Sequence, residues 1–269
     1  MTCDVTSGPM RTMQAPILMA PGQLTPPVGS LLKKKKNKTA MASLSAISFA
    51  IATVLAGYLA SLCLTPPNPN PSHERGKDSI GFVNHPAAVL VFRLIPFGFS
   101  LHHAAITLLL DSHGPAAFQH VPLNPRLFGW TWASSLGLLL IFIGATLRLA
   151  AFGALGSRFT FALTRPDELN TRGMYAYVQH PSYTGIVLVA IPLQLLFLRW
   201  DGWPAYWIPR SILDSLHGWG LVCYAAMVVL NVMALRLRIS EEEALLKEVF
   251  GKEWVIWNRQ TKRFIPGLF

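Results

Sequence analysis

An uncharged apolar run at residues 41–64 sets the strongest limit on how this chain can fold. The run reads MASLSAISFAIATVLAGYLASLCL and holds no Asp, Glu, Lys or Arg. About 20 apolar residues in a helix cross the roughly 30 Å hydrocarbon layer of a bilayer. The sequence therefore predicts a membrane-spanning helix here.

Four further apolar runs follow along the chain. Residues 87–110, which contain Pro96, and residues 129–147 are predicted to span the bilayer, while 184–198 is a shorter run and 215–235 gives a fifth span. Only 13% of the 269 residues are charged, against about 25% in soluble domains. The pattern predicts an all-α integral membrane protein with about five transmembrane helices.

The N-terminal segment and the cysteines carry little structural signal. Residues 1–40 are rich in Pro, Gly, Thr and Met and end near a lysine run, which is typical of a disordered tail. The lysines either contact lipid headgroups or are simply solvated. Cys3, Cys63 and Cys223 match neither a metal-binding spacing nor a disulfide framework. We therefore expect no metal.

The basic residues indicate which side of the membrane each segment occupies. The formal net charge is +10, and the basic residues flank apolar runs, as the positive-inside bias requires, rather than forming a nucleic-acid surface. Segments 148–183 and 236–269 are both basic and are separated by two spans, so both are predicted to face the cytosol. Either the N-terminus is then lumenal or one early span is miscounted.

A polar stretch precedes the fourth apolar run. It reads GMYAYVQHPSYTG (173–185). Pro181 suits the first turn of a helix and pushes the preceding His180 out of helical geometry. The imidazole is then fixed at a helix N-terminus, where free N–H groups can face a polar ligand. The alternative is a belt of Tyr and His side chains at the lipid–water boundary.

Two further groups of charged residues have both a structural and a functional interpretation. Ser240 and Glu243 match an S-x-x-E capping box, which would start a helix there. The same acidic stretch follows Arg238 on the predicted side of His180, where carboxylates would attract a cationic cofactor. Arg148, at the predicted end of the third span, is either a snorkelling charge or a site residue.

Taken in order, these pieces resemble the isoprenylcysteine carboxyl methyltransferases, which belong to a wider group with the phospholipid N-methyltransferases. The resemblance covers about residues 129–269, with Gln179 where the family often has arginine. The matching residues are Leu147-Arg148, Gly156 with Phe159-Thr160, Gly173-x-Tyr175, His180-Pro181-Ser182-Tyr183-x-Gly185, Arg238 with Glu242-Glu243, Phe250-Gly251-x-Glu253-Trp254, and Pro266-Gly267.

The resemblance implies an S-adenosyl-L-methionine site formed by a cytosolic C-terminal helical segment, in a multi-pass protein of the endoplasmic reticulum membrane. Composition and the apolar runs predict a tail (1–40) and N-terminal transmembrane helices (41–128), and the resemblance adds a methyltransferase core (129–269). Arg238, with Arg148, would hold the substrate carboxylate. The implied cofactor-binding residues are Leu169, Asn170, Tyr175, His180, Pro181, Ser182, Tyr183, Glu242 and Glu243.

The implied reaction is methylation of the C-terminal carboxylate of a prenylated cysteine. That carboxylate, with a pKa of about 3.3–3.7, is already ionised at neutral pH, so the site needs positioning and charge rather than a general base. Phospholipid N-methylation is the alternative within the same chemistry. A sterol reductase using NADPH, which the FGKEW…IPG ending also resembles, and a non-catalytic membrane scaffold are the other classes.

Overall fold

The computed structural model describes residues 41–68, 78–79 and 81–267, and over these residues it consists of helices and connecting loops without a named strand. One isolated parallel bridge joins Val178 and Lys262. The all-α prediction is confirmed. The predicted tail, residues 1–40, lies outside the described residues. Short 3₁₀ helices join the longer ones at Gly81–Asn84, Pro115–Phe118, Pro125–Leu127, Gly156–Arg158, Gly173–Ala176 and Trp203–Tyr206.

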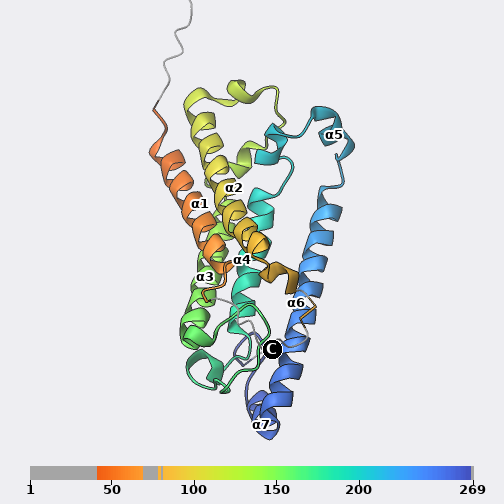
Figure 1. Cartoon of the computed structure of the whole chain (residues 1–269). Helices are drawn as coiled ribbons and strands as arrows, with labels where there is room; N and C mark the ends of the chain where they lie inside the picture. The colour runs from red at the N-terminus through yellow and green to blue at the C-terminus, as the bar shows by residue number, and fades with distance from the viewer. Residues whose placement is uncertain (1–40, 69–77, 80, 268–269) are drawn as a thin grey trace, which may run out of the picture. The chain divides into compact units, whose positions relative to one another are not determined.

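The first two helices, α1 (Leu44–Cys63) and α2 (Pro86–His113), lie against each other (Figure 1). A β-carbon built on Gly57 would lie 2.1 Å from Ser100 Oγ, so only glycine fits at this contact. Small residues allow such close approach in membrane proteins, where lipid supplies no hydrophobic force between helices. Pro96, which the sequence places in the second predicted span, lies within α2.

The second pair is α3 (Trp132–Leu155) and α4 (Pro181–Phe197). Thr131 and Ser134 form a reciprocal capping box that starts α3. The two helices meet through Gly144 and Gly185, since a β-carbon on Gly185 would lie 2.7 Å from Gly144 O. A core that includes Phe49, Leu138, Ile141 and Phe197 joins this pair to α1.

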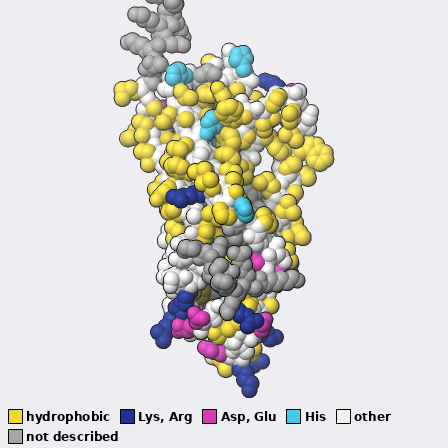
Figure 2. All heavy atoms as spheres, viewed as in Figure 1, with side chains coloured by type: hydrophobic (Ala, Val, Ile, Leu, Met, Phe, Trp, Pro, Cys, Tyr) yellow, Lys and Arg dark blue, Asp and Glu magenta, His cyan; other side chains and the backbone are white. Residues whose placement is uncertain are grey.

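Four of the described helical segments are long and apolar enough to cross a membrane: α1, α2, the Pro125–Arg158 segment that contains α3, and Gly220–Phe250. The predicted short run at 184–198 lies in α4, a helix of 17 residues, which falls below that length. Figure 2 shows hydrophobic side chains over much of the visible face, with most charged side chains gathered at the end that carries α7 (Lys252–Gln260).

The helix after the short α5 (Arg210–Ser215) corrects one prediction. α6 (Gly220–Phe250) runs without interruption from the apolar run through the acidic stretch. Ser240 lies in its interior and its Oγ donates to Leu237 O at 2.8 Å, so the predicted capping box is wrong. In a continuing helix the backbone N–H groups already bond four residues back, and none is left for a cap.

A small core packs beneath the polar loops. Leu169, Tyr175, Trp254 and Trp257 bury their side chains together, which joins α7 to the loop before α4. Gly251 turns the chain between α6 and α7 with a φ of 51°, a conformation that favours glycine. Figure 1 shows α7 at the same end of the helices as the irregular segment 156–180. This end carries the candidate site.

Candidate functional site

The start of α4 is built as the sequence predicts. Pro181 is the first helical residue and His180 lies outside helical geometry, with φ −125° and ψ 56°. The His180 side chain is 3% exposed. Backbone bonds from Gln179 N to Lys262 O (2.7 Å) and from His180 N to Arg263 O (2.9 Å) fix the residues before the helix to the C-terminal segment. The imidazole is therefore held in one place.

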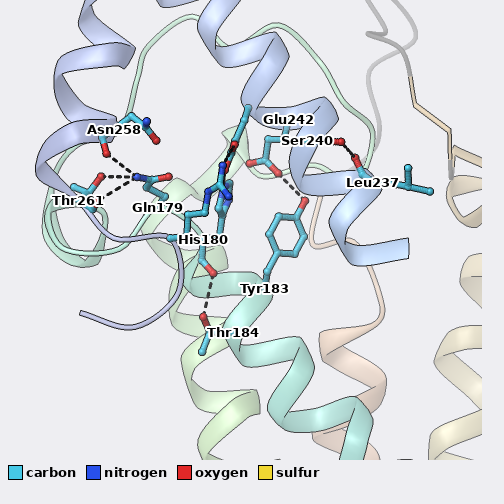
Figure 3. Close-up of polar contacts among 11 residues, drawn as sticks. Gln179, His180, Tyr183, Thr184, Leu237, Ser240, Glu242, Asn258 and Thr261 are labelled. Atoms are coloured by element: carbon cyan, nitrogen blue, oxygen red, sulfur yellow. Dashed lines mark hydrogen bonds and ion pairs between the residues drawn. The ribbon is translucent and has the colours of Figure 1, made fainter. Parts of the chain in front are cut away.

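The acidic stretch of α6 meets this helix start. Tyr183 Oη donates to Glu242 Oε2 at 2.6 Å, and His180 Nε2 lies 3.2 Å from Glu243 Oε1. Figure 3 shows Tyr183 pointing from α4 toward Glu242 on α6. Two segments separated by about 60 residues thus form one polar cluster, as the sequence predicts. We call Tyr175, His180, Tyr183, Glu242 and Glu243 the α4–α6 cluster.

The two glutamates of this cluster have different surroundings. Glu243 also accepts a hydrogen bond from Arg263 Nη2 at 2.7 Å, so its charge is shared between His180 and the C-terminal segment. Glu242 acts electrostatically on Tyr175: burial raises the pKa of the Tyr175 phenol, and the Glu242 carboxylate raises it further. Like an ordinary phenol, Tyr175 is neutral near pH 7, and its hydroxyl can donate to an acceptor.

Arg238 lies beside the cluster and its guanidinium is already engaged. Nη1 is 2.9 Å from Asp78 Oδ1, and Nη2 donates to Phe161 O. Both charged side chains are largely buried, with 10% and 13% of their surfaces exposed. The next residue, Ser79, donates to Glu241 of α6 from its backbone N–H and its hydroxyl. The first loop thus reaches the site.

Asp78 is a site residue that no sequence motif predicts. It lies in a polar loop, and no local pattern distinguishes it from other loop residues. One signal was available, because two predicted spans separate this loop from segment 148–183 and so place both on the same side. That signal indicates that the loop and the segment lie on the same side of the membrane, but it does not identify Arg238 as the partner of Asp78.

Arg148 is not a snorkelling charge. It lies within α3, is 7% exposed, and bonds three oxygens of neighbouring helices. Nε donates to Cys63 O at 2.7 Å, and Nη1 donates to Ser182 Oγ at 2.8 Å and to Ser182 O at 3.1 Å. The guanidinium also lies over the Phe152 ring. Arg148 therefore links α1, α3 and α4, and its predicted contact with a substrate stays a prediction.

Gln179, at the position where the family often has arginine, forms hydrogen bonds to the end of α7. Its Nε2 donates to Asn258 O (3.1 Å), Thr261 O (3.2 Å) and Thr261 Oγ1 (3.1 Å). Figure 3 shows the side chain pointing toward Asn258 and Thr261. Gln179 thus ties the start of α4 to the C-terminal end of α7.

The remaining predicted site residues lie around the cluster in two groups. Ser182 contacts Arg148, and Pro181 is buried at the start of α4. Leu169 packs against Tyr175 in the small core, whereas Asn170 Nδ2 donates to Ala154 O at 3.3 Å. That any of these residues touches a cofactor stays a prediction. No group of three or more potential metal-ligating side chains occurs among the described residues.

The chain is similar in sequence to a known family of membrane methyltransferases. Residues 136–202 match the isoprenylcysteine carboxyl methyltransferase (ICMT) family. The chain is 33% identical over 168 residues to protein-S-isoprenylcysteine O-methyltransferase A of Arabidopsis thaliana, a match that covers 61% of this chain and 74% of that protein. The chain belongs to the ICMT family. The resemblance in the sequence motifs is thereby confirmed.

Other ICMT relatives match over a smaller share of their length. The protein-S-isoprenylcysteine O-methyltransferase of Tribolium castaneum is 28% identical over 169 residues, 61% of this chain and 53% of that protein. The Homo sapiens protein is 27% identical over 146 residues, 53% of this chain and 44% of its own. The chain thus spans about half the length of these relatives. A solved ICMT structure aligns with a TM-score of 0.42 and 19% identity, covering 70% of this chain and 71% of that one.

Proposed function

We propose that this protein transfers a methyl group from S-adenosyl-L-methionine to the C-terminal carboxylate of a prenylated cysteine. The observation that carries the proposal is the convergence of His180 and Tyr183 of α4 with the Glu242 and Glu243 carboxylates of α6. Membership of the ICMT family supports it. The family match at 136–202 includes α4 but ends before α6, so the acidic half of the site rests on geometry.

The chemistry of the α4–α6 cluster fits the proposed cofactor. When bound, S-adenosyl-L-methionine supplies an electrophilic methyl group on a cationic sulfur. Glu242 offers a negative charge within reach of two phenols, which suits a cation in a partly buried site. We infer that Glu242 attracts the cofactor, that His180 and Tyr183 orient it, and that Leu169, Asn170, Tyr175, Pro181, Ser182 and Glu243 complete the binding site.

Arg238 is the proposed holder of the acceptor carboxylate, with Arg148 as a second cation. A guanidinium can bind a carboxylate through two parallel N–H donors, which fixes its direction as well as its place. Because the carboxylate is already ionised, the protein has only to align it with the methyl group. Such alignment can supply roughly 7–11 kcal/mol of the barrier.

The apolar helices and the charged end of the protein suggest how a prenylated substrate would lie in the membrane. A prenyl tail gains about 0.8 kcal/mol per buried CH₂ in the bilayer, so the tail stays among the lipids while the carboxylate reaches the charged end seen in Figure 2. The basic segments around this end favour the cytosolic side. We propose the endoplasmic reticulum membrane as the location, as the family implies.

One observation favours phospholipid N-methylation as a second candidate. Arg238 already pairs with Asp78, and Glu241, Glu242 and Glu243 lie near it on α6. An ammonium headgroup would be drawn to those acids, whereas a carboxylate has to compete with Asp78 for the guanidinium. The proposed ester-forming reaction and this amine reaction give chemically different products.

The test offers both acceptors at once. Purified protein in detergent receives radiolabelled S-adenosyl-L-methionine together with N-acetyl-S-farnesylcysteine and phosphatidylethanolamine. The proposal expects base-labile label, a methyl ester, on the farnesylcysteine. Base-stable label on the lipid would replace it with the second candidate, and no transfer to either acceptor would refute both.

A pair of arginine variants then assigns the acceptor site. Arg238→Ala should abolish methyl transfer while leaving cofactor affinity within about twofold, because the arginine is assigned to the acceptor alone. Arg236→Ala is the matched control, since this arginine lies two residues earlier on α6 and is exposed. Equal loss of cofactor binding in the Arg238 variant would contradict the assignment.

A further inference from the structure

The Asp78–Arg238 ion pair has a consequence for any carboxylate acceptor. Arg238 Nη1 is fully buried and its ion-pair partner there is Asp78 Oδ1, at 2.9 Å. Nη2 donates to the backbone oxygen of Phe161. A guanidinium binds a carboxylate in bidentate fashion through a pair of adjacent N–H groups. Tyr183 is a further hydrogen-bond partner of this guanidinium, so a bidentate acceptor has to displace a partner.

Asp78 is the partner that can be displaced at the lower cost. A backbone carbonyl such as that of Phe161 is fixed by its chain, whereas the Asp78 carboxylate turns on two side-chain torsions. Replacing Asp78 by an acceptor exchanges one carboxylate for another on the same cation. Arg238 therefore stays paired and avoids a cost of several kcal/mol. The cost that remains is the loss of this cation by the Asp78 carboxylate, whose side chain is 13% exposed.

The neighbouring contacts keep Asp78 close to the arginine. Ser79 donates to Glu241 of α6, one turn after Arg238, so the residue following Asp78 is attached to the same helix. A carboxylate held in this way competes as an intramolecular ligand, at a high effective concentration.

We propose, resting on the function proposed above, that Asp78 occupies Arg238 in place of the acceptor carboxylate and is displaced by it. Asp78 thereby sets the affinity for a carboxylate acceptor and gives the site a paired resting state. The apparent affinity of an acceptor falls by the fraction of protein in which Arg238 is available. If Asp78 occupies the arginine for about nine-tenths of the time, that reduction is about tenfold.

The test measures binding rather than turnover. Isothermal titration in detergent compares N-acetyl-S-farnesylcysteine, which carries the carboxylate, with its methyl ester, which does not. Asp78→Asn should bind the acid about tenfold more tightly than the wild type and bind the ester equally well. Asp78→Glu, which keeps the charge, should resemble the wild type. Asp214→Asn is the matched control, an exposed aspartate on α5.

The outcomes separate this inference from the proposed function. Unchanged or weaker acid binding by Asp78→Asn would overturn the inference, and so would an equal change for acid and ester or no binding of the acid by any variant. The affinities for the acid and for the ester are measured on the same preparation of each variant, and their ratio is compared. If part of a preparation is unfolded, the number of binding sites falls but this ratio does not change. If the acid binds more tightly to Asp78→Asn but is never methylated, the proposed function fails and the inference stands.

Discussion

Replacing Gly144 by alanine should force α3 and α4 apart and destabilise the protein. A β-carbon at this position would lie 2.7 Å from Gly185 O and 2.6 Å from Leu188 Cβ, whereas ordinary contacts begin at 3.4 Å. The helices would have to separate by roughly 0.7 Å, because a close-packed interface cannot absorb the extra methyl group. The contact lies one turn before Arg148, which links α3 to Ser182 of α4.

The expected magnitude follows from two opposing effects. Overpacking costs typically about 1–3 kcal/mol, while replacing glycine by alanine within a helix gains about 0.5–1 kcal/mol. Gly144→Ala should therefore lower the free energy of unfolding by about 1 kcal/mol, within a range of about 0–2.5 kcal/mol. Gly153→Ala is the matched control, since it lies on the same helix and nothing approaches its β-carbon within 4 Å. That control should gain about 0.5–1 kcal/mol.

The assay is reversible unfolding in mixed micelles of mild detergent and dodecyl sulfate, followed by far-UV circular dichroism. Methyl transfer is measured on the same preparations, and it should fall in Gly144→Ala because the Arg148–Ser182 contact depends on the spacing of α3 and α4. If Gly144→Ala proved as stable as Gly153→Ala, the close contact would not exist and the packing argument would be refuted.

Substitutions at three further positions test other contacts of the structure. Arg148→Leu should destabilise the protein in unfolding assays by about 1–3 kcal/mol for each buried oxygen that it leaves unpaired, the oxygens being those of Cys63 and Ser182; wild-type stability would contradict its linking role. Gln179→Leu should lower activity through loss of its α7 contacts, and Gln179→Arg should retain it if arginine can donate to the same carbonyls; equal loss in both would refute this. Burial alone would raise the pKa of Asp201, but the hydrogen bonds from Arg199 and Asn124 and the charge of Arg199 together outweigh burial and lower that pKa. Its contribution, about 0.5–1 kcal/mol for a half-exposed pair, is therefore present above about pH 4 and lost as the pH falls; Asp201→Asn should reduce the fall in melting temperature below pH 4, and an unchanged profile would contradict this.

The sequence predicts the parts of this protein that local chemistry decides. Uncharged runs identify the long helices, because a bilayer requires a fixed length of apolar helix. Pro181 fixes the start of α4 and the geometry of His180, because its ring constrains both residues. Motif order predicts that the acids of α6 join them, and the Tyr183–Glu242 contact agrees.

Packing decides the features that the sequence does not reveal. The Ser240 capping box fails because a capping signal only permits a helix start, and α6 continues through it. Arg148 lies inside the protein because α1 and α4 supply oxygens for it, which no pattern in its own segment indicates. The Asp78–Arg238 pair joins residues far apart in the sequence, and a single sequence gives no information about such partners.

The most direct test of the central claim is the affinity for S-adenosyl-L-methionine after neutralising single carboxylates on α6. Glu242→Gln removes the charge that meets Tyr183, and Glu248→Gln removes an exposed charge on the same helix that pairs with Arg165. Isothermal titration should show cofactor binding weakened at least tenfold, about 1.4 kcal/mol, in Glu242→Gln and unchanged in Glu248→Gln. Equal affinity of both variants and the wild type would contradict a cofactor site formed by α4 and α6.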